Sequence, residues 1–207
     1  MTGTRGARPF DAVLCDVDNV IRFYDASEVT RLERAAGLAE GTTMKVAFAP
    51  EADLPLMLGR IDMRDWVSVV VAGFDGSVPE PLAYKLAQAL ADAPFHADPT
   101  VVSLLRRVRD VVPLVLVTNA AVTLEADLET LGLTGLAHHV VSSARVRLVK
   151  PDPRIYRIAA DRAGVPPQRC LFVDDSPENV SAAAGLGMRT AHFTEPADLA
   201  RALAPLL

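Results

Sequence analysis

From residue 98 to the end of the chain, short apolar runs alternate with helical stretches. The spacing of apolar residues and the positions of proline and glycine predict helices at residues 99–110, 123–131, 153–163, 177–186 and 197–206. The apolar runs predict strands at residues 112–117, 139–141, 170–173 and 188–193. Strands that alternate with helices form parallel β-α-β units, so we expect an α/β fold with a doubly wound, parallel, Rossmann-like sheet.

Another strand is predicted near the start of the chain, in the apolar run at residues 12–15. The pattern then becomes helical, with stretches from Ser27 to Gly37 and at residues 43–49, 51–58, 62–74 and 79–92. Residues 67–71 are rich in valine, but Trp66, Val69 and Val70 repeat at helical spacing, so this stretch is also assigned to a helix. We therefore expect a Rossmann-like core of residues 1–22 and 98–207, interrupted by a helical cap of residues 23–97.

Polar side chains stand where the predicted strands end or where a helix begins. The carboxyl ends of parallel strands meet at one edge of a sheet, which is where open α/β folds bind ligands. Asp16 and Asp18 point to the same side if their segment is extended, because successive side chains alternate. The polar residues at this edge are Asp16 and Asp18 after the first strand, Thr118 and Asn119 after the second, Lys150 before a helix, and Asp174 and Asp175 after the fourth.

Four carboxylates at one edge repel one another. Two unit charges about 4 Å apart repel by roughly 4 kcal/mol at an effective dielectric constant near 20. Lys150 supplies one compensating charge, so either some of the acids are protonated or a metal ion binds. The ligand atoms are all oxygens, with no cysteine or histidine among them, which favours a hard ion such as Mg²⁺ over zinc.

The chain resembles the haloacid dehalogenase superfamily in four motifs, which occur in the order of that family and span most of the chain. They are the pair Asp16 and Asp18, the Val-Thr-Asn stretch at residues 117–119, the Lys-Pro-Asp-Pro stretch at residues 150–153 and the Val-Asp-Asp stretch at residues 173–175. The resemblance implies a hydrolase with a small helical cap inserted after the first strand. Two positions depart from the family pattern, because Asn19 and Arg147 stand where glycine is expected.

The resemblance also implies a mechanism, that of a Mg²⁺-dependent phosphatase acting on a small phosphorylated metabolite. Asp16 would attack phosphorus and become an aspartyl phosphate, and Asp18 would serve as general acid and base. Thr118, Asn119 and Lys150 would bind the substrate phosphate. The implied metal ligands are the carboxylates of Asp16 and Asp175, the backbone carbonyl of Asp18, and Asp174 either directly or through water.

Alternative functions use the same fold. A 2-haloacid dehalogenase shares the nucleophile but needs no metal, and in that branch the second aspartate and the terminal acid pair are typically altered. A phosphomutase would use the same residues, and a non-catalytic or receiver-like phosphate-binding protein is a further alternative. Taken singly, each polar residue also has a simpler role as a turn, a helix cap or a surface charge. Arg22, Tyr24 and Arg60 are predicted to be solvated or hinge residues rather than substrate ligands.

Composition restricts the partners and the location. The chain has 207 residues and a formal net charge of −5, which argues against a nucleic-acid-binding face. The two cysteines lie in apolar runs, as expected in a reducing compartment. The longest apolar run, residues 67–74, is too short to span a membrane, and residues 1–10 lack the apolar stretch of a signal peptide. We expect a cytoplasmic protein without nucleic-acid or membrane partners, and a homodimer stays open.

Overall fold

The computed structural model describes residues 8–207 and is built around a parallel sheet of five strands in the order β5-β4-β1-β6-β7. The strands are β1 (Ala12–Cys15), β4 (Leu114–Thr118), β5 (His139–Ser142), β6 (Cys170–Asp174) and β7 (Arg189–His192). The predicted α/β fold is confirmed, and the strand order places β1 at the centre of the sheet. The predicted core includes residues 1–7, and the predicted absence of a signal peptide concerns residues 1–10. Residues 1–7 lie outside the described residues.

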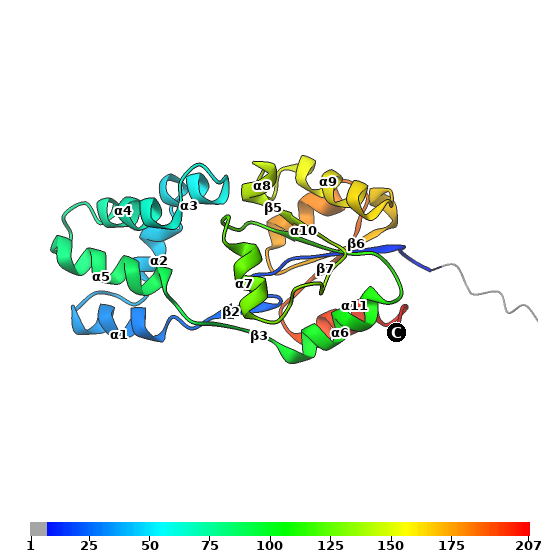
Figure 1. Cartoon of the computed structure of the whole chain (residues 1–207), viewed down its shortest axis with the longest axis horizontal. Coiled ribbons are helices and arrows are strands. Elements are labelled where there is room, and N and C mark those ends of the chain that lie inside the picture. Colours follow the sequence, from blue (N-terminus) through cyan, green and yellow to red (C-terminus); the bar gives the residue numbers. More distant parts are fainter. Residues whose placement is uncertain (1–7) are drawn as a thin grey trace, which may run out of the picture.

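Helices cover both faces of this sheet (Figure 1). They are α6 (Pro99–Arg109), α7 (Leu124–Thr130), α9 (Pro153–Ala163), α10 (Pro177–Ala184) and α11 (Pro196–Leu203), together with the short α8 (Ser143–Val146) and the 3₁₀ turn η1 (Pro167–Arg169). Val13 and Cys15 of β1 pack with α6, α7 and α11, whereas Ala12 and Leu14 pack with α9 and α10. Strand β1 is therefore buried on both faces up to the residue before Asp16.

The helices and strands predicted after residue 98 are all present, with ends that shift by at most three residues. Helix α9 has both predicted bounds, because Pro153 opens it and Gly164 ends it in a left-handed conformation. Helix α8 and turn η1 are not predicted, since each is too short to show a periodic pattern. Within residues 8–207, the apolar segments of the helices fall short of the length needed to cross a membrane.

Five helices lie between Ser27 and Ala91. These cap helices are α1 (Ser27–Ala35), α2 (Thr42–Ala47), α3 (Pro50–Met57), α4 (Met63–Gly73) and α5 (Glu80–Ala91). They pack around their own apolar cluster, which includes Trp66, Val70 and Leu86. Figure 1 shows them gathered at one end of the molecule, with the sheet and its helices at the other. The valine-rich stretch is helical, as predicted, because Trp66, Val67 and Val70 fill the inner face of α4.

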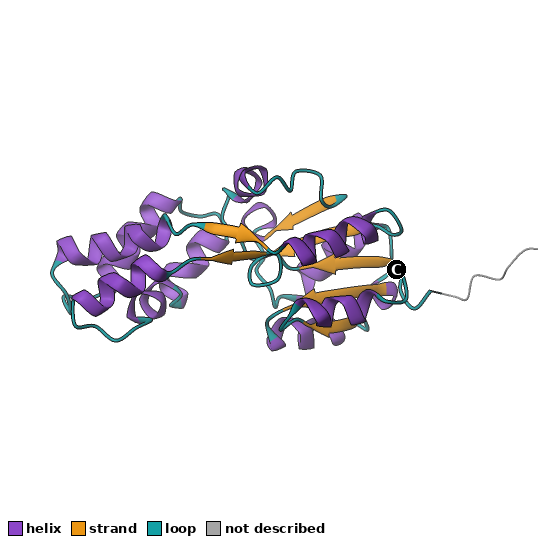
Figure 2. Ribbon diagram, turned by 90° about the horizontal axis from the view of Figure 1, so that it is seen from below, coloured by secondary structure: helices purple, strands orange, loops and turns teal. Residues whose placement is uncertain are grey.

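Two short strands connect the cap helices to the core (Figure 2). Strand β2 (Arg22–Tyr24) pairs antiparallel with β3 (Phe95–Ala97), so that Arg22 lies opposite Ala97. Neither strand is predicted from the sequence. Three residues are too few to show alternation, and the two partners are separated by the whole insertion. We refer to β2 and β3 together as the hinge strands.

The cap helices contact the core at a second place, beside α8. The Ser143 hydroxyl donates a 2.6 Å hydrogen bond to the carbonyl of Met57 at the end of α3, and accepts one of 3.0 Å from the backbone N–H of Ala120. Gly59 lies against the Ala144 backbone so closely that a Cβ atom would come within 2.9 Å of the Ala144 oxygen. This contact and the hinge strands together set where the cap helices stand relative to the carboxyl edge of the sheet.

A buried carboxylate, Glu33 of α1, organises the start of α2. It is 1% exposed, and its two oxygens accept the backbone N–H groups of Thr43 at 2.6 Å and Gly41 at 2.8 Å. Residue Gly41, which precedes α2, has no side chain that could cap the helix, so Glu33 supplies this function from another helix.

We predict that Glu33→Ala destabilises the cap, because it leaves two backbone donors without an acceptor in a largely buried place. A buried donor left unpaired costs about 1–3 kcal/mol. Denaturant unfolding of the wild type and the variant measures the difference in the free energy of unfolding. Glu28→Ala is the matched control, since Glu28 pairs with Arg31 on the exposed face of the same helix. Equal losses in the two variants would contradict the capping role of Glu33.

Candidate active site

Three neighbouring strands deliver polar residues to the carboxyl edge of the sheet. Cys15 at the end of β1 lies opposite Leu116 of β4 on one side and Val173 of β6 on the other. The chain therefore presents Asp16 close to Asp174, the last residue of β6. The parallel register and the central position of β1 account for this convergence, as predicted from the strand ends.

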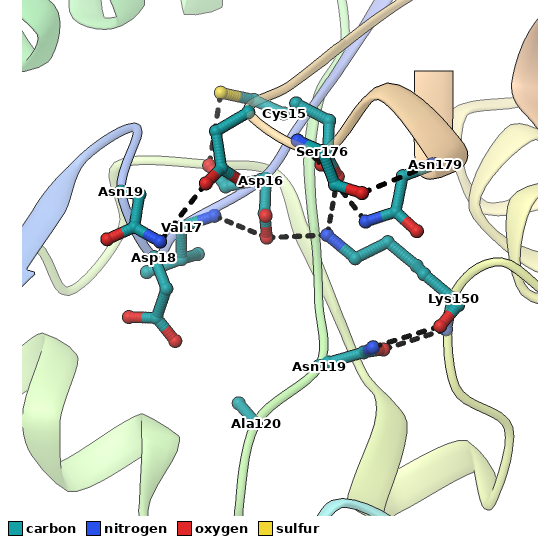
Figure 3. A network of polar contacts seen from close by, with 12 residues as sticks. Cys15, Asp16, Val17, Asp18, Asn19, Asn119, Ala120, Lys150, Ser176 and Asn179 are labelled. Carbon is teal, nitrogen blue, oxygen red and sulfur yellow. Dashed lines mark hydrogen bonds and ion pairs between the residues drawn. The ribbon is translucent and has the colours of Figure 1, made fainter. Parts of the chain in front are cut away.

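Lys150 forms a buried ion pair with two of these carboxylates (Figure 3). Its Nζ lies 2.7 Å from Oδ1 of Asp16 and 2.7 Å from Oδ2 of Asp174. The three residues are 5%, 6% and 0% exposed, so the pair is nearly closed to water. Burial acts to lower the pKa of Lys150, but the two carboxylates outweigh it and the pKa is raised. Burial raises the pKa of Asp16, an effect that Lys150 opposes and Asp174 reinforces.

Asn119, predicted to bind substrate, holds the loop that carries Lys150. Its Oδ1 accepts the backbone N–H of Lys150 at 2.7 Å, and its Nδ2 donates to the Lys150 carbonyl at 3.0 Å. The side-chain amide of Asn119 thus bonds to both the N–H and the carbonyl of Lys150, as the backbone of a neighbouring strand would. Arg147 in the same loop has a left-handed backbone with φ of 56°, the conformation that explains why glycine is expected there.

Both carboxylate oxygens of Asp174 are engaged. While Oδ2 faces Lys150, Oδ1 accepts the backbone N–H of Ser176 at 2.9 Å and Nδ2 of Asn179 at 3.0 Å. Ser176 and Asn179 belong to the start of α10, where Ser176 is also the N-cap. Asn179 is not among the site residues predicted from the sequence. The feature that points to it is its position about one helical turn after the helix cap Ser176. Asp174 therefore joins Lys150 to the first turn of α10.

Asp175 completes a cluster of three carboxylates. One oxygen from each of Asp16, Asp174 and Asp175 lies within 4.8 Å of the others. Asn19 donates from Nδ2 to Oδ2 of Asp175 at 3.1 Å, and its backbone is left-handed with φ of 59°. Burial raises the pKa of Asp175. An all-oxygen set that carries more negative charge than Lys150 balances fits a hard divalent cation such as Mg²⁺.

Asp18 points away from the pair of Asp16 and Lys150 (Figure 3) and toward the hinge strands. Its two oxygens accept Nε of Arg22 at 2.6 Å and Nη2 of Arg22 at 3.0 Å. Arg22 is 3% exposed, and its Nη1 reaches Oδ2 of Asp127 at 2.7 Å. The hinge position predicted for Arg22 agrees with its place in β2, whereas a solvated position does not, because two carboxylates surround it. By contrast, Tyr24 and Arg60 are exposed.

Thr118 ends β4 beside this cluster and is 1% exposed. Its hydroxyl has no hydrogen-bond partner among residues 8–207. A buried hydroxyl without a partner is costly, and most such groups are paired with protein, water or ligand. Water or a ligand would complete the hydrogen bonding of the Thr118 hydroxyl.

Comparison with known proteins matches residues 10–187 to the family of haloacid dehalogenase-like hydrolases. Among curated proteins, a phosphoserine phosphatase from Thermus thermophilus is 41% identical over 68 residues, a match that covers 31% of this chain and 26% of the relative. The curated relatives at the head of the comparison are matched over less than a third of their own length.

Solved structures show the same fold at low identity. A haloacid dehalogenase family enzyme from Bacteroides thetaiotaomicron, in complex with magnesium and inorganic phosphate, superposes with a TM-score of 0.66 at 17% identity, over 87% of this chain and 92% of that chain. L-2-haloacid dehalogenase from Xanthobacter autotrophicus, with chloropropionic acid covalently bound, gives 0.61 at 21% identity, over 94% and 82%. The fold is thus shared with an enzyme that binds magnesium and inorganic phosphate and with a dehalogenase.

We predict that Lys150→Met strongly destabilises the folded protein in metal-free buffer, because Asp16 and Asp174 would remain buried without a counter-charge. Removing one partner of a buried ion pair costs about 3–5 kcal/mol. Denaturant unfolding in the presence of a chelator measures the loss. Lys85→Met is the matched control, since Lys85 is exposed on α5. If both variants lose the same small amount, Lys150 does not hold the site together.

Proposed function

Because the chain belongs to the haloacid dehalogenase-like hydrolases, we propose that it is a Mg²⁺-dependent phosphatase that cleaves a small phosphate monoester. The observation that carries the proposal is the charge of the site, where the carboxylates of Asp16, Asp174 and Asp175 converge around the ammonium group of Lys150. Phosphoryl transfer depends mainly on positioning and on stabilising negative charge, which Lys150 and a bound cation would supply here.

Asp16 is the proposed nucleophile. Its Oδ1 accepts hydrogen bonds from Lys150 Nζ and, at 2.8 Å, from the backbone N–H of Val17. Both donors reach the same oxygen, so Oδ2 remains for the attack on phosphorus. The new bond joins Oδ2 to phosphorus while the bond from phosphorus to the ester oxygen breaks, and the result is an aspartyl phosphate. Lys150 favours the ionised form of Asp16 that this step needs.

Asp18 is the proposed general acid and base. It gives a proton to the departing ester oxygen in the first step, and in the second it takes a proton from the water that attacks the aspartyl phosphate. The second step releases inorganic phosphate and restores the Asp16 carboxylate. In this proposal the Thr118 hydroxyl, which has no partner among the described residues, donates to a phosphoryl oxygen in both steps.

The metal ligands proposed for Mg²⁺ are the carboxylates of Asp16 and Asp175 and the backbone carbonyl of Asp18. Asp174 would contribute directly or through water, and its two oxygens also accept hydrogen bonds from Lys150, Ser176 and Asn179. When bound, the cation would neutralise charge on the phosphoryl oxygens and on Asp16.

A 2-haloacid dehalogenase is the principal alternative, because that chemistry occurs on the same fold. The retention of Asp18 and of both acids at the end of β6 favours phosphoryl transfer, which uses an acid–base residue and a metal. Screening a panel of phosphorylated metabolites with and without Mg²⁺, and 2-haloacids beside them, separates the two. A phosphomutase would return a phosphorylated isomer instead of inorganic phosphate. The cytoplasmic location, the lack of a nucleic-acid partner and a homodimer stay predictions from the sequence.

For the nucleophile, we predict that Asp16→Asn abolishes turnover in the screen while the protein stays folded, because the amide has nearly the same shape as the carboxylate. Asp18→Asn should retain the fold and lower turnover by about 10²–10⁴-fold, the usual contribution of a general acid and base. Turnover numbers together with circular dichroism check both variants. Full activity of Asp16→Asn would rule out the covalent mechanism.

For the metal, we predict that the hydrolysis stops in a chelator and returns with Mg²⁺. Asp175→Asn should weaken Mg²⁺ binding more than Asp174→Asn, because Asp175 has fewer protein partners and is free to contact the ion directly. Isothermal titration of Mg²⁺ measures this without any turnover. Asp92→Asn, an exposed aspartate after α5, is the control. Undiminished activity in metal-free buffer would contradict the proposed Mg²⁺ requirement.

A further inference from the structure

We propose that Arg22 is a positioning residue for Asp18, which sets the direction of the acid–base carboxylate from the strand that connects the core to the cap helices. The proposal deepens the phosphatase reaction proposed above and rests on it. It concerns the two contacts that Arg22 makes with Asp18, the contact it makes with Asp127, and its place in the hinge strands.

Each of the three nitrogen atoms of the Arg22 guanidinium group donates to a carboxylate. Nε and Nη2 hold the two oxygens of Asp18 side by side, and Nη1 holds Asp127 on α7. The side chain of Arg22 is 3% exposed, whereas those of Asp18 and Asp127 are 30% and 24% exposed. A charge so completely enclosed is not presented to a substrate. Arg22 therefore acts through the two carboxylates that it holds, those of Asp18 and Asp127.

The contacts with Asp18 determine more than its distance. A fork of two parallel N–H donors fixes the plane of a carboxylate as well as its place. Because Arg22 is in turn held by Asp127 on the core helix α7, the fork cannot follow Asp18 if that side chain rotates. A single-point donor such as lysine lacks this property. Without Arg22, Asp18 would be a partly exposed side chain with several accessible rotamers.

The backbone reinforces this arrangement. Arg22 donates its N–H to the carbonyl of Val17 at 2.8 Å, and its own carbonyl accepts the N–H of Asn19 at 2.9 Å. The loop between Val17 and Arg22 is therefore closed on itself, with Asp18 inside it. On the other side, the guanidinium carbon lies 5.0 Å from the ring centre of Tyr24 and 5.5 Å from that of Phe95, one residue on each hinge strand.

Proton transfer to a leaving oxygen depends on where the donor points, and a misplacement of about 1 Å can cost on the order of 10²-fold in rate. The dependence is strongest for substrates whose leaving group is a poor one, because these need the proton most. A residue that positions Asp18 should therefore matter more for an alkyl phosphate than for an aryl phosphate that departs readily. A residue that merely stabilises the hinge should affect both alike.

The experiment compares the full-length Mg²⁺-loaded wild type with Arg22→Met and Arg22→Lys on glycerol 2-phosphate and on p-nitrophenyl phosphate. We expect Arg22→Met to lower kcat for the alkyl ester on the order of 10²-fold, with a much smaller loss for the aryl ester and little change in KM. Arg22→Lys should recover part of the loss. Arg169→Met is the matched control, because Arg169 makes the same two-point contact with Asp11 remote from the site.

Two further variants keep the test decisive. Asp127→Asn removes the tether of Arg22 but leaves its fork on Asp18, so it should shift the ratio of the two rates in the same direction by less. In an Asp18→Asn background, Arg22→Met should add no further preference for the aryl ester. The inference is overturned if Arg22→Met lowers both rates equally, or if its effect persists in full without Asp18. Absence of phosphatase activity in the wild type would overturn the proposed function and this inference with it.

Discussion

The buried ion pair of Lys150 is the interaction on which the candidate site depends. Asp16 and Asp174 end neighbouring strands, and their carboxylates would repel each other in a place nearly closed to water if no cation stood between them. The backbone of Lys150 is bonded to Asn119, the residue after β4, so Lys150 joins the ends of three adjacent strands. Desolvation of these charges is offset because almost every oxygen has a donor, including the first turn of α10 behind Asp174.

The sequence predicts the part of this arrangement that is encoded locally. In β1, β4 and β6 every side chain is buried, so each appears as a continuous apolar run with a sharp polar end. The parallel topology then brings the polar ends of these strands to the same edge of the sheet, whatever conformation the loops adopt. The resemblance to the family also indicates the left-handed positions, because it places glycine where Asn19 and Arg147 stand and both residues have positive φ values. Asparagine accepts that conformation readily, whereas Arg147 holds it at some cost in strain.

The contacts that the sequence does not predict join residues far apart in the chain. Arg22 has no local signal of burial, since Asp127 belongs to a helix on the other side of the insertion. The hinge strands are similar, because each is stable only through the other. Asn119 is ambiguous for a different reason: a polar residue after a strand serves equally to bind a ligand or to fasten a loop, and its amide is engaged with the backbone of Lys150. The local sequence pattern thus predicts which residues come together, and their contacts with distant residues decide what each of them does.

The contrast between which residues gather and what each of them does also applies to the choice between the proposed phosphatase and the alternative dehalogenase. An aspartate after β1 and a lysine beside it would serve a dehalogenase and a phosphatase alike, so neither residue decides between them. In the proposed function the distinguishing groups are those that add negative charge beyond what Lys150 balances, namely Asp175 in the carboxylate cluster and Asp18 toward the hinge strands. Asp175 is held by Asn19 in the loop that follows β1, and Asp18 is held by Arg22 at the start of β2. The loop after β1 connects Asp16, the proposed nucleophile, to the hinge strands. Because Arg22 lies in β2, a displacement of the hinge strands would act on Asp18, the proposed acid–base residue, whereas Asp16 is held by groups outside those strands, Lys150 and the Val17 backbone.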